Sequence, residues 1–261
     1  MRFGFRRVRF PFTAVCCLLS VASSVYAQGQ PDAPESLPSE RTLEVIDRKV
    51  VRKLGPHSFA IGLVRLDSAV REIRFPAKVN MNEGLIEVVV CTEQGKLHES
   101  ILVSPIAPIH LHMALLMLGL EPGRNPGWYV SPDPALREPD WNAPPGACVD
   151  VFVRWETPEG VREVRAEELL KDERSGQPMS RTSWVFVGSN VSKQGVYAAD
   201  TLGSIVTNYH DRTAVLDNPL DTGQVDDFTF ARTELIPGAG TPVEVRLVPV
   251  KTPKEIPDDN E

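Results

Sequence analysis

The sequence predicts an α+β domain that is β-rich, with mostly antiparallel sheets packed around one buried helix at about residues 108–118. Short runs rich in β-branched and aromatic residues recur along the chain, separated by residues that favour turns. One long apolar segment has helix boundaries at both ends. Of the 261 residues, 42% are hydrophobic and 24% charged, a composition that can bury a core and that excludes a wholly disordered chain.

Residues 1–27 have the pattern of a secretory signal peptide. A basic start precedes an apolar segment that ends in Val25-Tyr26-Ala27, so cleavage is expected after Ala27. A membrane anchor is disfavoured because the apolar run falls short of the roughly 20 residues that a span needs. A lipid-attached start at Cys16 or Cys17 is disfavoured because neither follows a small residue. We therefore expect an exported protein, periplasmic or extracellular, with no membrane span in its mature chain.

Two polar segments flank the single domain that we expect at residues 41–250. Residues 28–40 are rich in proline, as is typical of a flexible leader, and residues 251–261 form an acidic tail that we expect to be disordered. The formal net charge is −7. Removal of the signal segment, which contains arginines and no acidic residue, makes the net charge of the mature chain more negative. This acidic balance argues against a nucleic-acid partner.

Strand-forming runs occupy most of the expected domain. The apolar run Leu85–Cys91, the turn at residues 93–96 and the returning run Leu97–Val103 predict a β-hairpin. Further strands are expected at residues 42–46, 59–64, 148–155, 161–164, 183–187, 204–206, 228–234 and 243–248.

One helix is predicted strongly. Pro108 suits the first helical position and Gly119 the residue after the last. The segment between them is apolar on nearly every face, which predicts a buried helix. A short second helix is expected at residues 166–171.

Residues 121–146 form a proline-rich segment with three large aromatic residues, Trp128, Tyr129 and Trp141. We expect an extended strap that these side chains attach to the domain by packing. The alternative is a glycan-binding surface, because exposed aromatic rings can stack on sugars.

Several motifs together resemble the YdjY-domain family of exported bacterial proteins, over roughly residues 70–249. They are Phe75-Pro-Ala-Lys-Val-Asn80, Gly84-Leu-Ile-Glu-Val88, Gly95-Lys-Leu-His-Glu-Ser100, the helix from His110 with Gly119 to Gly123, Trp184-Val-Phe-Val-Gly-Ser189 and Asp211 to Pro219. The resemblance implies no established activity and supplies no catalytic residue.

Five polar residues are the candidates for chemistry: His98, Glu99, Ser100, His110 and His112. A buried histidine in an apolar helix needs a polar partner. In one interpretation, His112, Glu99 and Ser100 satisfy one another and nearby backbone groups in a buried polar network. A metal site would combine the histidines with Glu99. An acid–base enzyme would use His98 as the base and Glu99 to orient it.

Cysteine usage limits the cofactors. Cys91 and Cys148 are the only cysteines expected to remain after export, and they are a possible disulfide pair or two isolated thiols. Two thiols cannot hold an iron–sulfur cluster alone, which usually takes four cysteines. No cofactor is expected, although a divalent metal at the histidine cluster is an option.

The common enzyme signatures are absent from the sequence. The function that we expect is therefore a module that binds a ligand or partner in the cell envelope, and whether it is an enzyme stays open. The partner is unknown: an envelope protein, a small ligand or a glycan.

Overall fold

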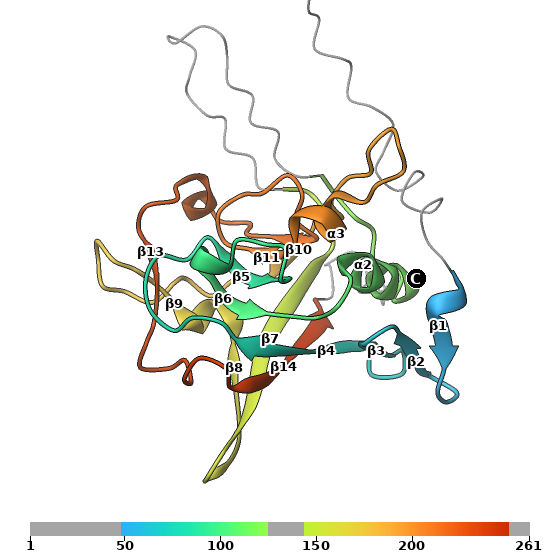
Figure 1. Ribbon diagram of the computed structural model, residues 1–261, viewed down its shortest axis with the longest axis horizontal. Helices are drawn as coiled ribbons and strands as arrows, with labels where there is room; N and C mark the ends of the chain where they lie inside the picture. Colours follow the sequence, from blue (N-terminus) through green and yellow to red (C-terminus); the bar gives the residue numbers. More distant parts are fainter. Residues whose placement is uncertain (1–47, 125–143, 251–261) are drawn as a thin grey trace, which may run out of the picture. The chain divides into compact units, whose positions relative to one another are not determined.

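The computed structural model describes residues 48–124 and 144–250, all within one compact unit of the chain (Figure 1). The strands are β1 (Val51–Lys53), β2 (Ser58–Ile61), β3 (Val64–Asp67), β4 (Glu72–Val79), β5 (Val88–Cys91), β6 (Ser100–Val103), β7 (Cys148–Thr157), β8 (Gly160–Arg165), β9 (Leu170–Asp172), β10 (Trp184–Phe186), β11 (Ser204–Thr207), β12 (Leu216–Asp217), β13 (Thr229–Ala231) and β14 (Pro242–Pro249). The α-helices are α2 (Pro108–Met117) and α3 (Ala198–Leu202). Short 3₁₀ helices are η1 (Arg48–Val50), η2 (Leu97–Glu99), η4 (Ala166–Leu169) and η5 (Asp221–Gln224).

Eight strands close into a barrel. They pair in the order β4-β14-β7-β10-β12-β11-β5-β6, and β6 pairs back with β4. Strands β1 to β3 continue the sheet from β4, and β8 pairs with β7 outside the ring. All pairings are antiparallel except β5 with β6 and β11 with β12, so the expectation of a β-rich and mostly antiparallel fold is confirmed. Closure removes the free edges of these strands.

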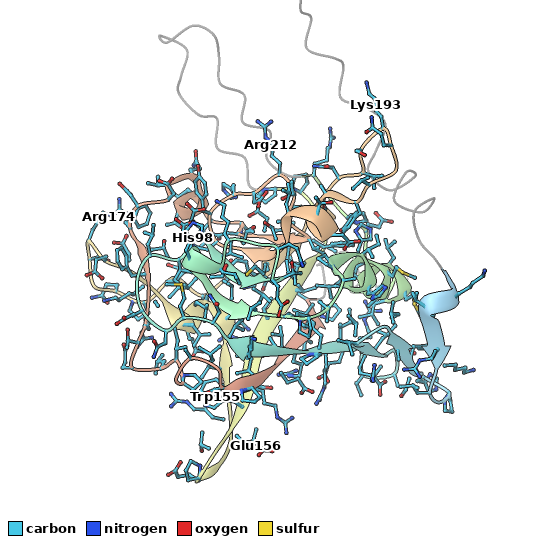
Figure 2. The ribbon with its side chains drawn as sticks, viewed as in Figure 1. His98, Trp155, Glu156, Arg174, Lys193 and Arg212 are labelled. Carbon is cyan, nitrogen blue, oxygen red and sulfur yellow. The ribbon has the colours of Figure 1, made fainter. Side chains whose placement is uncertain are left out.

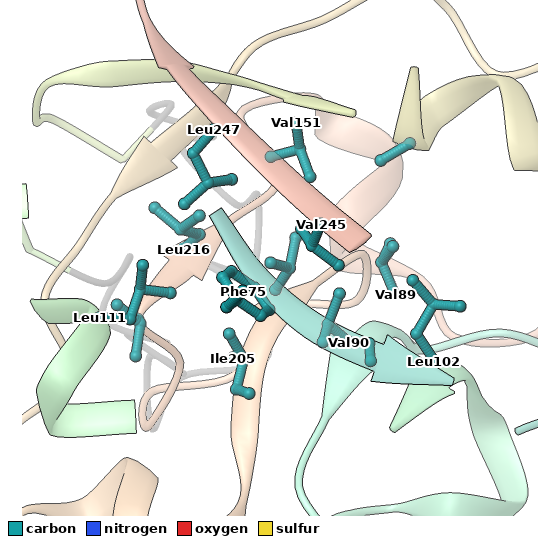
Figure 3. Close-up of a cluster of buried hydrophobic side chains, with 14 of the residues drawn as sticks. Phe75, Val89, Val90, Leu102, Leu111, Val151, Ile205, Leu216, Val245 and Leu247 are labelled. Carbon is teal, nitrogen blue, oxygen red and sulfur yellow. The ribbon is translucent and has the colours of Figure 1, made fainter. Parts of the chain in front are cut away.

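The longer barrel strands alternate between buried and more exposed residues, as the pleat of a half-buried strand requires. In β4, β7 and β14 the buried positions are mostly Val, Ile, Leu, Phe and Trp. Figure 3 shows Phe75 of β4 among core side chains from several strands, including Val90, Ile205, Leu216 and Val245. The core is therefore built mainly from strand side chains that face one another.

Helix α2 begins at Pro108, as predicted, but the sheets do not wrap around it. It contacts β2, β3 and α3, and Leu111 reaches the core beside Phe75 (Figure 3). The side chain of Met117 is 40% exposed, so the helix is not buried on every side. The strands instead close on one another, and a pattern of apolar residues along the chain does not show that pairing.

The predicted hairpin at residues 85–103 is wrong, because β5 and β6 run parallel. After β5 the chain returns through a tight turn at Gly95, where an added Cβ would lie 3.1 Å from the carbonyl oxygen of Gly203. It then turns again in η2 before β6 begins. Strands β5 and β6 thus lie within the two predicted strand ranges, and residues 92–99 return the chain to the beginning of β5 before β6 starts.

Other expectations differ in detail. The run at residues 59–64 is divided by a turn at Gly62, which has a φ of 56° and separates β2 from β3. The second helix is the 3₁₀ turn η4, and the chain continues directly into β9. Strand β4 had no counterpart among the predicted strands. The strand expected at residues 42–46 lies outside the described residues, and within the described part no helix is long and apolar enough to cross a membrane.

Candidate functional site

The five polar residues that the sequence indicates do not form one cluster. His98 and Glu99 lie in η2, Ser100 begins β6, and His110 and His112 lie in α2. The His98 side chain is 78% exposed (Figure 2), whereas His112 is fully buried. In residues 48–124 and 144–250, no group of three or more His, Cys, Asp and Glu side chains is placed to hold a metal ion.

His112 is held in the core by two aromatic residues, Tyr197 and Phe186. Its Nδ1 atom lies 2.9 Å from the hydroxyl oxygen of Tyr197, which itself donates to the carbonyl oxygen of Gly188 at 3.2 Å. Because that hydroxyl proton is used, Nδ1–H of the imidazole is the donor to Tyr197. The rings of Phe186 and Tyr197 meet the imidazole edge-on. Burial lowers the pKa of His112 to about 4, so the ring is neutral at pH 7.

His110 lies at the other side of the same helix turn, beneath the β2–β3 turn. A Cβ atom added to Gly62 would collide with the Nδ1 atom of His110. Asp200 of α3 accepts a hydrogen bond from the backbone N–H of Ile109 at 2.9 Å, and burial raises the pKa of this carboxyl. Burial lowers the pKa of His110, and the nearby Asp200 opposes that effect. His110 therefore joins α2 to the β2–β3 turn.

Glu99 belongs to a pair of carboxyl groups with Glu87. The backbone N–H of Glu87 donates to the carbonyl oxygen of Glu99 at 3.1 Å, and the Glu87 carboxylate forms an ion pair with Lys96. Burial and then the neighbouring Glu87 raise the pKa of Glu99. The Lys96 ammonium also lies 5.9 Å from the centre of the Tyr209 ring. The Nε2 atom of His98 is 3.7 Å from a Glu99 carboxylate oxygen.

The expected contacts among His112, Glu99 and Ser100 themselves are therefore wrong, whereas the expected bonding to a nearby backbone group is found for Ser100. The Ser100 hydroxyl donates to the backbone carbonyl of Lys96 at 2.6 Å, and the other two residues have the separate partners described above. Sequence reasoning missed Glu87 and Lys96. The available signal was that Glu87 is the one charged residue in the apolar run at residues 85–91.

A second buried polar group, which the sequence analysis also missed, contains His210 and Asp217. Their Nδ1 and Oδ2 atoms are 3.0 Å apart, and the Thr207 hydroxyl donates to Oδ1 of Asp217 at 2.8 Å. The backbone N–H of Asn218 donates to the same oxygen at 2.9 Å. Burial raises the pKa of Asp217, and the hydrogen bond from His210 opposes this. These bonds fasten the loop between β11 and β12, which is a structural role.

The remaining candidates divide into free thiols and residues outside the described ranges. Cys91 is buried, Cys148 is partly exposed, and neither forms a disulfide in the structure. Trp128, Tyr129, Trp141 and the cleavage site at Ala27 lie outside the described residues. Of the tryptophans within them, Trp155 is 6% exposed and Trp184 is fully buried, so neither presents an open ring face for a sugar.

A groove of about 490 Å³ lies on the outer face of the barrel where β4, β14, β7 and β8 are neighbours. Figure 2 labels Trp155 and Glu156 in this part of the molecule. Charged and apolar side chains line it, among them Arg74, Arg154, Glu244, Trp155, Val161 and Pro242. The groove therefore combines the surfaces that a small ligand with both polar and apolar parts would need.

Cross-strand register places Arg154 between two carboxylates, yet both are paired with other arginines. Arg154 is opposite Glu244 of β14 and Glu163 of β8. Arg74 lies 3.2 Å from Glu244, and Arg246 binds both oxygens of Glu163 at 2.6 and 2.9 Å. This contact with Arg246, and secondarily the charge of Arg154, lowers the pKa of Glu163. Within the described residues no ion pair forms at Arg154 itself, a half-buried residue that lines the groove.

Comparison with known proteins places the chain in a family. The profile of the YdjY domain matches residues 64–248, which include all eight barrel strands, helix α2 and the groove. No curated protein and no solved structure gives a significant match. Since the family profile covers most of the sequence and most of the described structure, the chain belongs to the YdjY domain family.

Proposed function

We propose that the protein is an exported module of the bacterial cell envelope that binds a ligand or partner in the outer-face groove. The signal-like start at residues 1–27 supports export. The observation that carries the proposal is the groove itself, in which the half-buried residue Arg154 lies beside apolar surface. Binding sites of small ligands commonly combine apolar walls with a few placed polar groups.

Export has a direct test. The chain isolated from its natural host is expected to begin at Gln28, as read by N-terminal sequencing of the envelope or secreted fraction. An uncleaved chain in the cytoplasm, or a start at an acylated Cys16 or Cys17, would contradict this part of the proposal.

Binding at the groove is tested by site-specific photocrosslinking in living cells. A photoreactive residue replaces Val161, which is 54% exposed and lines the groove. The matched control replaces Val70, which is 67% exposed and lies in the turn before β4. We expect a discrete adduct from position 161 and none from position 70, with the bound mass read by mass spectrometry. No adduct at position 161, or the same adducts at both positions, would remove the support for a binding groove.

A further inference from the structure

We infer that the groove takes a monoanionic ligand in which a carboxylate stands beside an apolar group, and that Arg154 binds the carboxylate. This inference rests on the proposed function, because it identifies the ligand class of that same groove. It goes further by assigning the anchoring residue and the charge of the ligand.

The first argument is the charge balance around Arg154. Its two cross-strand neighbours, Glu244 and Glu163, are engaged by Arg74 and by Arg246, both of which also pair with Glu72. Partial burial deprives a guanidinium of some hydration, and an anion restores the lost interaction. A carboxylate matches the planar fork of an arginine with two parallel hydrogen bonds.

The second argument concerns the net charge of the ligand. Glu244 and Glu156 also line the groove, and the Glu244 side chain is 41% exposed. A dianion such as phosphate would bring two negative charges near these carboxylates, and like charges in contact are unfavourable. A single carboxylate satisfies Arg154 with less repulsion.

The third argument concerns the rest of the ligand. Val161 is 54% exposed at one wall of the groove, Pro242 contributes further apolar surface, and Trp155, which is 6% exposed, adds little to it. An aliphatic group that covers Val161 would be removed from water on binding. Two sources have this chemistry: the C-terminus of a peptide, and an acidic side chain next to an apolar one. Both present a carboxylate group.

The test titrates isotope-labelled mature chain with four probes and follows the NMR signals of the Val161 amide and the Arg154 Nε–H group. The probes are N-acetyl-leucine, its uncharged amide, N-acetyl-leucyl-glutamate amide and inorganic phosphate. We expect saturable shifts with N-acetyl-leucine. The affinity for the amide should be lower than that for the acid by about tenfold or more, because a hydrogen bond to a charged group is lost. The glutamate probe shows whether a side-chain carboxylate serves as well as a terminal one.

Two variants complete the test. Arg154→Gln is expected to abolish the preference for the acid over the amide. Arg52→Gln, which removes an exposed arginine of β1, is expected to retain it. Equal affinity for acid and amide, tighter binding of phosphate, no saturable shift with either carboxylate probe, or an unchanged preference in Arg154→Gln would overturn the inference. An adduct at position 161 in cells together with any of these results would leave the groove as a binding site and remove only its assignment to carboxylates.

Discussion

Acidification should destabilise the folded protein through His112, by about 3 kcal/mol between pH 7 and pH 4. The pKa of this imidazole falls from 6.5 to about 4 on burial, and each tenfold change in proton affinity is worth about 1.4 kcal/mol. At a pH between these two pKa values, the imidazole is protonated in the unfolded chain and neutral in the folded chain. Stability therefore rises with pH across this window and is lost as the pH falls through it.

The assay is urea unfolding at several pH values for the parent and for His112→Asn. Asparagine retains an N–H donor for Tyr197 but does not titrate. At pH 7 the parent should be more stable by ~1–3 kcal/mol, because the variant loses packing and strains the hydrogen bond. That advantage should shrink or reverse by pH 4, while other titrating groups cancel in the difference. A difference that stays constant from pH 7 to pH 4 would refute the reasoning, since His112 would then have the same pKa in both states.

Three further outcomes are expected. Gly62→Ala should cost ~1–3 kcal/mol, because its φ is 56° and the imidazole beneath it leaves no space for a Cβ, whereas Gly119→Ala, with nothing within 4 Å of the added atom, should cost less in the same melting experiment. Glu99→Gln should stabilise the protein at pH 7 by only about 0.5 kcal/mol, since Lys96 offsets part of the effect of burial and of Glu87, and should lose that effect near pH 3; a variant that is less stable at pH 7 would contradict the raised pKa. Thiol titration of the unfolded, unreduced protein should find both Cys91 and Cys148 reactive, whereas a disulfide would leave neither thiol reactive. In the native protein only the partly exposed Cys148 should react readily.

The parts of the fold that sequence patterns predict are those that depend on local periodicity. Strands β7 and β14 alternate along their length, and α2 begins at a proline, so each is recognisable without knowledge of its neighbours. The parallel pairing of β5 with β6 is different. The turn that returns the chain from β5 lies against Gly203, which is far from it in the sequence. No pattern within residues 85–103 contains that information.

The candidate site divides in the same way. His112 was predicted to be buried because its own helix is apolar, and the structure confirms its burial. Arg154 was not identified, because nothing in β7 distinguishes it from other strand arginines. It stands apart only because Arg74 and Arg246, from β4 and β14, take the carboxylates on either side. That information exists only after four strands, β4, β7, β8 and β14, have paired.

The place of β14 in the barrel has a consequence for how the chain folds. This strand is the last among the described residues but lies between β4 and β7, and it joins residues as far apart as Arg74 and Glu244. Contacts of such long sequence separation form slowly, because closing the long loop between them costs conformational entropy before the contacts can compensate for it. A nascent or truncated chain that ends before Pro242 leaves β4 and β7 without their common partner and exposes two strand edges that can pair with other chains. Such a chain is expected to aggregate. Folding therefore depends on keeping the edges of β4 and β7 from pairing with other chains until β14 is available.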